Sequence, residues 1–146
     1  MAITTNAIAN SFKKELLEAK HNFTQTSGDK FKIALYTNSS NLGKSTTSFT
    51  TDHQVSNTGQ YTSGGGKLAK GSQQTSVASS VAIVDFADRS FTGVTLTARG
   101  ALIYNTSNSN TAVAVLDFGG DKTATAGTFT IQFPAFTTSA AILRIS

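Results

Sequence analysis

The sequence contains no cysteine, no tryptophan and only one proline. The absence of cysteine excludes disulfide frameworks, thiol nucleophiles and Cys-based zinc sites, and it suits folding in a reducing cytoplasm. No stretch approaches the roughly 20 apolar residues of a membrane span. Residues 1–20 also lack the charged segment followed by an apolar run that marks a secretory signal. We therefore expect a protein made in the cytoplasm, without a membrane partner.

The chain is also short of negative charge, with eight acidic against twelve basic residues and a net charge of +4. The whole excess lies in residues 1–70, which hold eight lysines and four acidic residues. These lysines are scattered and no arginines and aromatic residues alternate with them, so a solvated surface is favoured over a nucleic-acid-binding patch. We expect no nucleic acid among the partners.

Serine and threonine are abundant, at 17 and 23 residues, whereas glutamate occurs only twice. Threonine favours strands, serine and glycine favour turns, and none of them favours long helices. A chain of 146 residues is long enough to bury a core as one domain without covalent cross-links. The composition therefore predicts a single, mainly β domain.

One helix is predicted near the N-terminus. Thr4 or Thr5 can cap it, and the apolar spacing predicts that it ends near Asn22. Four residues form an apolar stripe on one face of this helix, namely Ile8, Phe12, Leu16 and Ala19. We accordingly divide the chain into an N-terminal helical arm, residues 1–24, and a β-domain, residues 25–146.

Alternating apolar residues predict a strand over residues 30–37, and six further segments have strand character. Short breaks rich in Gly, Asn, Asp and Ser separate these six: 81–86, 91–97, 100–105, 111–118, 127–133 and 140–146. Short strands at this spacing, with no helices between them, predict an antiparallel β-sandwich or jelly roll. The same pattern excludes a doubly wound α/β sheet.

Residues 38–80 differ from the rest because Ser, Thr, Asn and Gly dominate them. A structureless loop of this length is uncommon in a compact domain. We therefore predict short irregular strands and turns that lie over the sheets, held by four isolated apolar residues, Phe49, Val55, Tyr61 and Leu68.

Two stretches imitate catalytic motifs. Asp117, Phe118 and Gly119 match the magnesium-binding triplet of protein kinases, but the other kinase motifs are missing and the chain is too short to hold them. We predict that Asp117 ends a strand and that residues 119–121 form a turn. The glycine-rich residues 58–71 fail the phosphate-loop pattern because Lys67 precedes leucine, so we predict a loop or hairpin with Tyr61 as its anchor.

The other ionisable residues do not form a recognisable catalytic or metal-binding set. Neither histidine has ligand spacing, both glutamates belong to the predicted helix near Lys14, and one aspartate pair flanks a turn without the calcium-loop pattern; these residues are His21, His53, Glu15, Glu18, Asp85 and Asp88. We expect no cofactor, no metal and no enzymatic activity. A small hydrolase or carbohydrate-active enzyme is the catalytic alternative, and the lack of an acid/base set argues against it.

Several motifs together resemble those of a known family. They are "SFKKELLEAKHNF" leading into "FKIALYT", then "YTSGGGKLAKG", "ARGALIYNTS", "AVAVLDFGGDKTATAGTFTIQFP" and "AILRIS". In these motifs, and along nearly its whole length, the chain resembles small β-rich virion structural proteins of tailed bacteriophages. The resemblance implies a cement or decoration protein on the capsid surface of the virion. Its implied partners are the major capsid protein and further copies of itself, as a homodimer or homotrimer.

A tail-associated virion protein, such as an adaptor or a host-attachment domain, is the alternative within the same family. We expect the contacts to come from the segments that a sandwich needs least. The predicted interface residues are Ile8, Phe12, Leu16, Tyr61 and Lys67. Packing of the helical stripe on the chain's own sandwich is the other interpretation, and the sequence leaves both open.

Overall fold

The structure, a computed structural model, describes residues 3–69, 75–134, 137 and 139–146. These residues form one helix, α1 (Asn10–Leu17), and eight strands: β1 (Ala7–Ile8), β2 (Phe31–Tyr36), β3 (Gly66–Lys67), β4 (Thr75–Ala78), β5 (Val81–Val84), β6 (Arg89–Asn105), β7 (Thr111–Ile131) and β8 (Leu143–Ile145). The predicted fold class, mainly β with one N-terminal helix, is confirmed.

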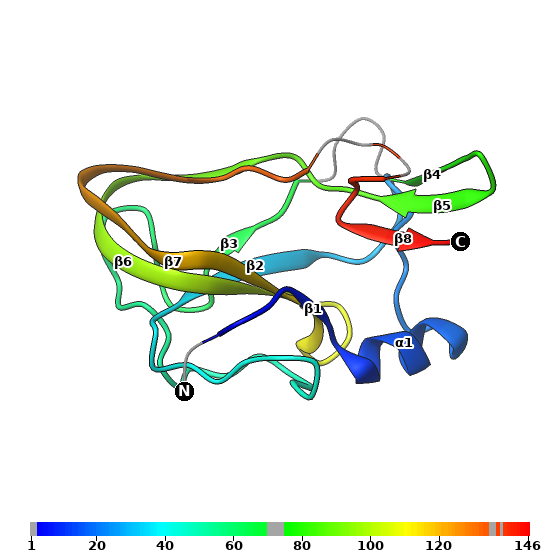
Figure 1. Ribbon diagram of the computed structural model, residues 1–146, viewed down its shortest axis with the longest axis horizontal. Helices are drawn as coiled ribbons and strands as arrows, with labels where there is room; N and C mark the ends of the chain where they lie inside the picture. The colour runs from blue at the N-terminus through cyan, green and yellow to red at the C-terminus, as the bar shows by residue number, and fades with distance from the viewer. Residues whose placement is uncertain (1–2, 70–74, 135–136, 138) are drawn as a thin grey trace.

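The strands form two antiparallel sheets. The larger sheet has the order β1-β7-β6-β2-β3, and the smaller has the order β4-β5-β8. Figure 1 shows the long β6–β7 pair curving back over β2 and β3, while the smaller sheet lies above α1 at the other end of the molecule. This arrangement is consistent with the predicted β-sandwich.

Strands β6 and β7 each replace two predicted strands. Four register shifts interrupt their pairing, and Gly119 adopts a φ of 78° within β7. Bulges and a left-handed glycine bend a strand without ending it, so the chain curves where turns were predicted. The prediction that Asp117 ends a strand is therefore wrong: Asp117 pairs with Gly100, and its carboxylate lies 3.3 Å from the Arg99 Nε.

The helix is shorter than predicted. Ala7 and Ile8 pair with β7, which fixes them in extended backbone, so the helix begins only at Asn10. At the other end Ala19 adopts a φ of 58°, which right-handed helix does not allow. The predicted caps near the start of the chain and the predicted end near Asn22 are both wrong.

The N-terminal segment shares the main hydrophobic core. Ile3, Ala9 and Phe12 are buried in the same cluster as the strands of the larger sheet. The ring of Phe12 lies 6.0 Å from the ring of Phe23, in an edge-on arrangement. The division into an arm at 1–24 and a domain at 25–146 is therefore not a division of the core.

The described part of the long polar segment, residues 38–69, is held by buried side chains as predicted. Val55, Tyr61 and Leu68 are buried, and Tyr61 has no exposed surface. The Tyr61 hydroxyl accepts hydrogen bonds from the Leu35 backbone N–H at 2.8 Å and from Gln54 Nε2 at 2.9 Å. This side chain therefore fastens the segment to β2 through both packing and hydrogen bonds.

Replacing Gly65 tests the close approach of this segment to β2. Gly65 has a φ of 78°, and a Cβ there would lie 1.8 Å from the Ile33 carbonyl oxygen. We expect Gly65→Ala to lower the free energy of unfolding by at least about 2 kcal/mol. Gly120→Ala is the matched control, because its Cβ would meet nothing within 4 Å. Equal urea midpoints for the two variants would contradict the packing described here.

The three tyrosines predict the alkaline limit of stability. Burial raises the pKa values of Tyr36 and Tyr61, and it raises the pKa of Tyr104 to about 12. Because unfolded tyrosine ionises near pH 10, the unfolded state releases protons first and stability falls as the pH rises above about 10. Tyrosinate absorbance should therefore rise together with the loss of circular dichroism. Titration of all three hydroxyls near pH 10 in a folded chain would refute this expectation.

Candidate docking groove

An apolar groove lies between α1 and one face of the smaller sheet. Its volume is about 370 Å³. Ile8, Phe12 and Leu16 line it from the N-terminal segment, and Val84 and Leu143 line it from the sheet. Both walls are apolar, so the groove suits hydrophobic side chains better than a polar reaction centre.

The pairing of the smaller sheet explains why its wall is apolar. Thr75, Val84 and Leu143 are cross-strand neighbours in one row, and the next row on the same face holds Val77, Ala82 and Ile145. Side chains of cross-strand neighbours lie on the same face of a sheet. Five of these six side chains are hydrophobic, so the face toward the groove is continuous and apolar.

Three large hydrophobic side chains are exposed in the described part of the chain. Leu17 is 91% exposed, Val77 is 72% exposed and Ile145 is 61% exposed. They lie on α1, β4 and β8, and each of these elements also contributes a residue to the groove. Exposed apolar side chains gathered at one place mark an interaction surface more often than single scattered ones do.

A second cavity of about 270 Å³ extends the first. Asn6 and Ala7 of the N-terminal segment line it, together with residues 114–116 of β7 and with Ala141 and Ile142. Ile8 and Arg144 contribute to both cavities. Together the two cavities form what we call the β1–β8 trough, with β1 and α1 along one wall and residues 140–145 along the other.

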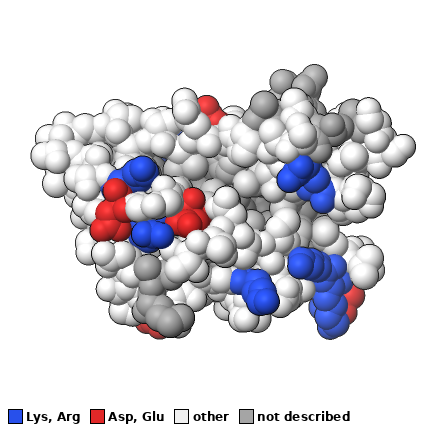
Figure 2. Space-filling model, viewed as in Figure 1, with Lys and Arg blue, Asp and Glu red and all other residues white. Residues whose placement is uncertain are grey.

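The rim of the trough is positively charged. Lys13 on α1 and Arg144 on β8 line the groove, and neither forms an ion pair with a described carboxylate. Figure 2 shows basic side chains over β8 and over α1, on either side of the hollow between them. Beside Lys13, Lys20 and Lys14 both form ion pairs with Glu18, and their hydrogen bonds lower the pKa of Glu18 to about 2. The Arg144 guanidinium donates a hydrogen bond to the Ser139 carbonyl oxygen at 2.7 Å, so an acidic group of a ligand would meet Lys13 and a guanidinium that its own segment already holds.

The structure brings three of the five predicted interface residues together. Ile8 and Leu16 are half-buried in the wall of the groove, and Phe12 forms its base with 2% of its surface exposed. Lys67 is exposed on β3, away from the groove. Tyr61 offers no surface to a partner, because it is enclosed in the core.

Sequence reasoning missed the opposite wall of the groove. Val77 and Ile145 lie far apart in the chain, and only the pairing of β4 and β8 with β5 places them in one row. The polar Ser76 and the apolar Val77, just before a turn, are the local sign in the sequence of the hairpin that β4 forms with β5. No local signal shows that β8 joins that hairpin.

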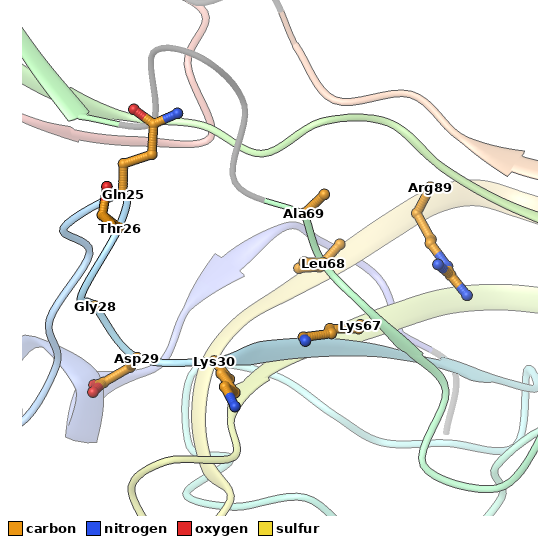
Figure 3. A pocket seen from close by; sticks show the side chains of 9 residues that line it. All are labelled: Gln25, Thr26, Gly28, Asp29, Lys30, Lys67, Leu68, Ala69 and Arg89. Atoms are coloured by element: carbon orange, nitrogen blue, oxygen red, sulfur yellow. The ribbon is translucent and has the colours of Figure 1, made fainter.

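A separate pocket of about 590 Å³, which is not part of the trough, is lined by three cationic side chains (Figure 3). Lys30, Lys67 and Arg89 line it, and their side chains point in different directions. The Arg89 guanidinium lies 4.9 Å from the centre of the Phe91 ring, and a Cβ at Gly66 would be 2.5 Å from its Nε. Arg89 thus packs against the protein, and the three charges do not converge on one anion position.

One buried acid–base pair has a structural role. His21 Nε2 lies 2.9 Å from a Glu15 carboxylate oxygen, and His21 Nδ1 lies 3.0 Å from Asn105 Nδ2. The ring of Phe12 covers the imidazole, with ring centres 4.8 Å apart. Both ring nitrogens are engaged, so the pair fixes α1 to the end of β6 without offering a free base.

The aspartates at the candidate calcium turn are engaged by backbone groups. An Asp85 carboxylate oxygen accepts a hydrogen bond from the Phe86 N–H, and burial raises the pKa of Asp85. Asp88 accepts a hydrogen bond from the Phe133 N–H. Within the residues that the structure describes, no group of three His, Asp or Glu side chains is placed to hold a metal ion.

Comparisons of the chain with protein-family models, curated proteins and solved structures find no match. Among the described helices, none is long and apolar enough to cross a membrane. The groove and the motifs of the sequence are therefore what support a function.

Variants of the groove should separate its surface from the core beneath it. We expect Leu17→Ser and Ile145→Ser each to change the free energy of unfolding by no more than about 0.5 kcal/mol, because both side chains are mostly solvated. Phe12→Ala should cost roughly 3–5 kcal/mol, because it opens a cavity under α1. Chemical denaturation measures all three. A large loss for Leu17→Ser or Ile145→Ser would mean that these residues serve folding.

Proposed function

We propose that this protein is a bacteriophage virion structural protein that binds the outer surface of the capsid and stabilises the shell. The observation that carries the proposal is the apolar groove, which exposed Ile145 lines, with exposed Val77 on the same sheet face and exposed Leu17 on the neighbouring helix. The resemblance of the sequence motifs to small virion proteins supports the same role. The major capsid protein is the proposed partner, and the virion surface is the proposed location.

A groove of this size supplies only modest affinity at one site. A capsid repeats each site many times, and a homodimer or homotrimer engages several subunits at once, so effective concentration multiplies the single-site affinity. Contacts across a boundary between shell subunits would then resist the pressure of the packaged DNA. Weak, repeated adhesion is thus sufficient for a cement protein.

The rigidity of the groove favours this role. The α1 wall is held by Phe12 and by the contacts of His21 with Glu15 and Asn105. A wall that is ordered before binding loses less conformational freedom when a partner docks. More of the contact energy therefore remains as affinity.

A non-enzymatic role is favoured by what the buried ionisable groups do. Glu15 and His21 bind one another, and Asp85 and Asp88 accept backbone hydrogen bonds. None of these groups lines the groove. The groove itself presents apolar side chains that bind by contact and carry out no proton transfer.

Electron microscopy of intact virions, with an antibody against this chain, tests the location. We expect labelling over the whole shell and a copy number close to that of the major shell protein. A few copies confined to the tail would assign the chain to the tail as an adaptor or attachment protein. Absence from purified virions would refute the proposal altogether.

Shell binding by groove variants tests the surface. We expect the double variant Val77→Ser, Ile145→Ser to bind undecorated capsids at least about tenfold more weakly, since burying one such side chain is worth roughly 1.5–3 kcal/mol. Thr125→Ser, an exposed change on β7, is the matched control and should bind normally. Co-sedimentation with capsids measures both. Equal binding of the two variants would place the contact surface elsewhere.

A further inference from the structure

The smaller sheet ends in a strand whose outer edge faces solvent. The order β4-β5-β8 makes β4 an edge strand, and β5 is its strand partner in the described part of the chain. Thr75, Ser76 and Val77 are all exposed. Figure 1 shows the β4–β5 hairpin extending outward at the end of the molecule that also carries β8. The outer edge of β4 is therefore accessible to another strand.

The turn of this hairpin determines which backbone groups point outward. Ser79 and Ser80 have φ values of 48° and 65°, as in a type I′ turn. Such a turn joins its two flanking residues by a backbone hydrogen bond, and bonded and unbonded pairs then alternate along an antiparallel ladder. Ser76 is accordingly bonded to β5, whereas the N–H and C=O groups of Thr75 and Val77 point away from β5. No hydrogen bond between described residues reaches these outward groups.

The β4 edge lacks the features that keep sheet edges from pairing. Natural edge strands are protected by charged side chains, by proline or by bulges. Residues 75–84 contain no charged residue and no proline, and the register of β4 with β5 is unbroken. By contrast, β7 carries Asp121 and Lys122 and has four register shifts against β6, and β8 carries Arg144. Among these edges β4 is the one best able to pair with another strand.

We propose that the β4 edge pairs in antiparallel direction with the β4 edge of a second copy of this chain. With Ser76 of the two copies opposite one another, Thr75 of each copy faces Val77 of the other. The outward N–H and C=O groups of both residues then find partners, and the two smaller sheets become one. This inference deepens the proposed function, on which it rests, because it identifies the surface that forms the expected homodimer.

The edge fits a copy of itself, which identifies the partner. Although the chain has a net charge of +4, residues 75–84 carry no charge, so the pairing brings no like charges into contact. Pairing of a strand with its own copy closes around a two-fold axis and uses up the β4 edge of both copies. Val77, which is largely exposed in the single chain, would pack beside Thr75 of the second copy. A second copy thus satisfies both the backbone and the side chains of the edge.

The pairing also determines how the two grooves are presented. Thr75 lines the groove, and Val77 lies on the same face of the smaller sheet. The two-fold axis is perpendicular to the sheet, so this face points to the same side in both copies. A strand of four residues buries little area, so the pair is weak in solution. On a shell, where both grooves meet one surface, effective concentration strengthens it.

A single introduced cysteine tests the register. The chain contains no cysteine, so Ser76→Cys supplies one thiol, which faces its counterpart at a Cα separation of about 4.5 Å, within disulfide range. Thr75→Cys is the matched control, because Thr75 faces Val77 of the second copy and lies too far from its own counterpart. Under mild oxidation we expect Ser76→Cys to form a disulfide dimer at least about tenfold faster. Equal rates would indicate random collision and overturn the pairing.

A proline tests the backbone hydrogen bonds. Val77→Pro removes an outward N–H and keeps the bonds to β5, which an edge strand tolerates. We expect the Kd of the dimer, measured by sedimentation equilibrium, to rise at least about tenfold. Val77→Thr keeps the N–H and the branched shape, and it should dimerise within about threefold of the unchanged chain.

Three results of sedimentation would overturn the pairing: a monomer at every concentration, a trimer, or equal Kd values for Val77→Pro and Val77→Thr. Circular dichroism checks that both variants are folded. If Val77→Pro does not fold, the relative oxidation rates of Ser76→Cys and Thr75→Cys decide.

The outcomes separate this inference from the proposed function. If Ser76→Cys cross-links selectively but purified virions lack the protein, the pairing stands and the proposed function falls. If the protein covers the shell while the two cysteine variants cross-link at equal rates, the pairing falls and the proposed function stands.

Discussion

The long antiparallel pairing of β6 with β7 is the interaction on which the rest of the structure depends. β2 pairs with β6 on one flank, and β1 pairs with β7 on the other. Tyr61 fastens the polar segment to β2 by a hydrogen bond, and the pairing of β1 with β7 holds the extended residues that precede α1. Without the ribbon, neither the core nor the N-terminal wall of the groove has a place to form.

A few residues of the N-terminal segment contribute both to the hydrophobic core and to the exposed surface. Phe12 lies under the helix in the core, while Leu16 and Leu17 of the same helix turn to the groove and to solvent. The two interpretations of the apolar stripe that the sequence leaves open are therefore compatible, since one helix packs inward and also forms a wall. Whether a partner uses that wall stays a prediction.

The sequence predicts what is local and misses what is not. Alternation predicts β2 at 30–37 within one residue at each end, and composition predicts the fold class. The predicted turn at residues 119–121 is absent, because the glycines there form a bulge within β7. Pairing with β6, which is distant in the sequence, keeps β7 continuous through that bulge. The start of α1 fails for a similar reason, since the pairing of Ala7 and Ile8 with β7 overrides local helix signals. The spacing of apolar residues in the sequence predicted one wall of the groove, which consists of Ile8, Phe12 and Leu16.

The two walls of the trough are supplied by the first and the last strands of the described chain, β1 and β8. A ribosome makes β8 after every other described strand, so a nascent chain holds only one wall for most of its synthesis. Under the proposed function, the order of translation alone would then prevent premature capture of the shell partner. Under the same proposal, proteolysis at residues 143–145 would remove one wall of the binding groove while leaving the β6–β7 ribbon whole.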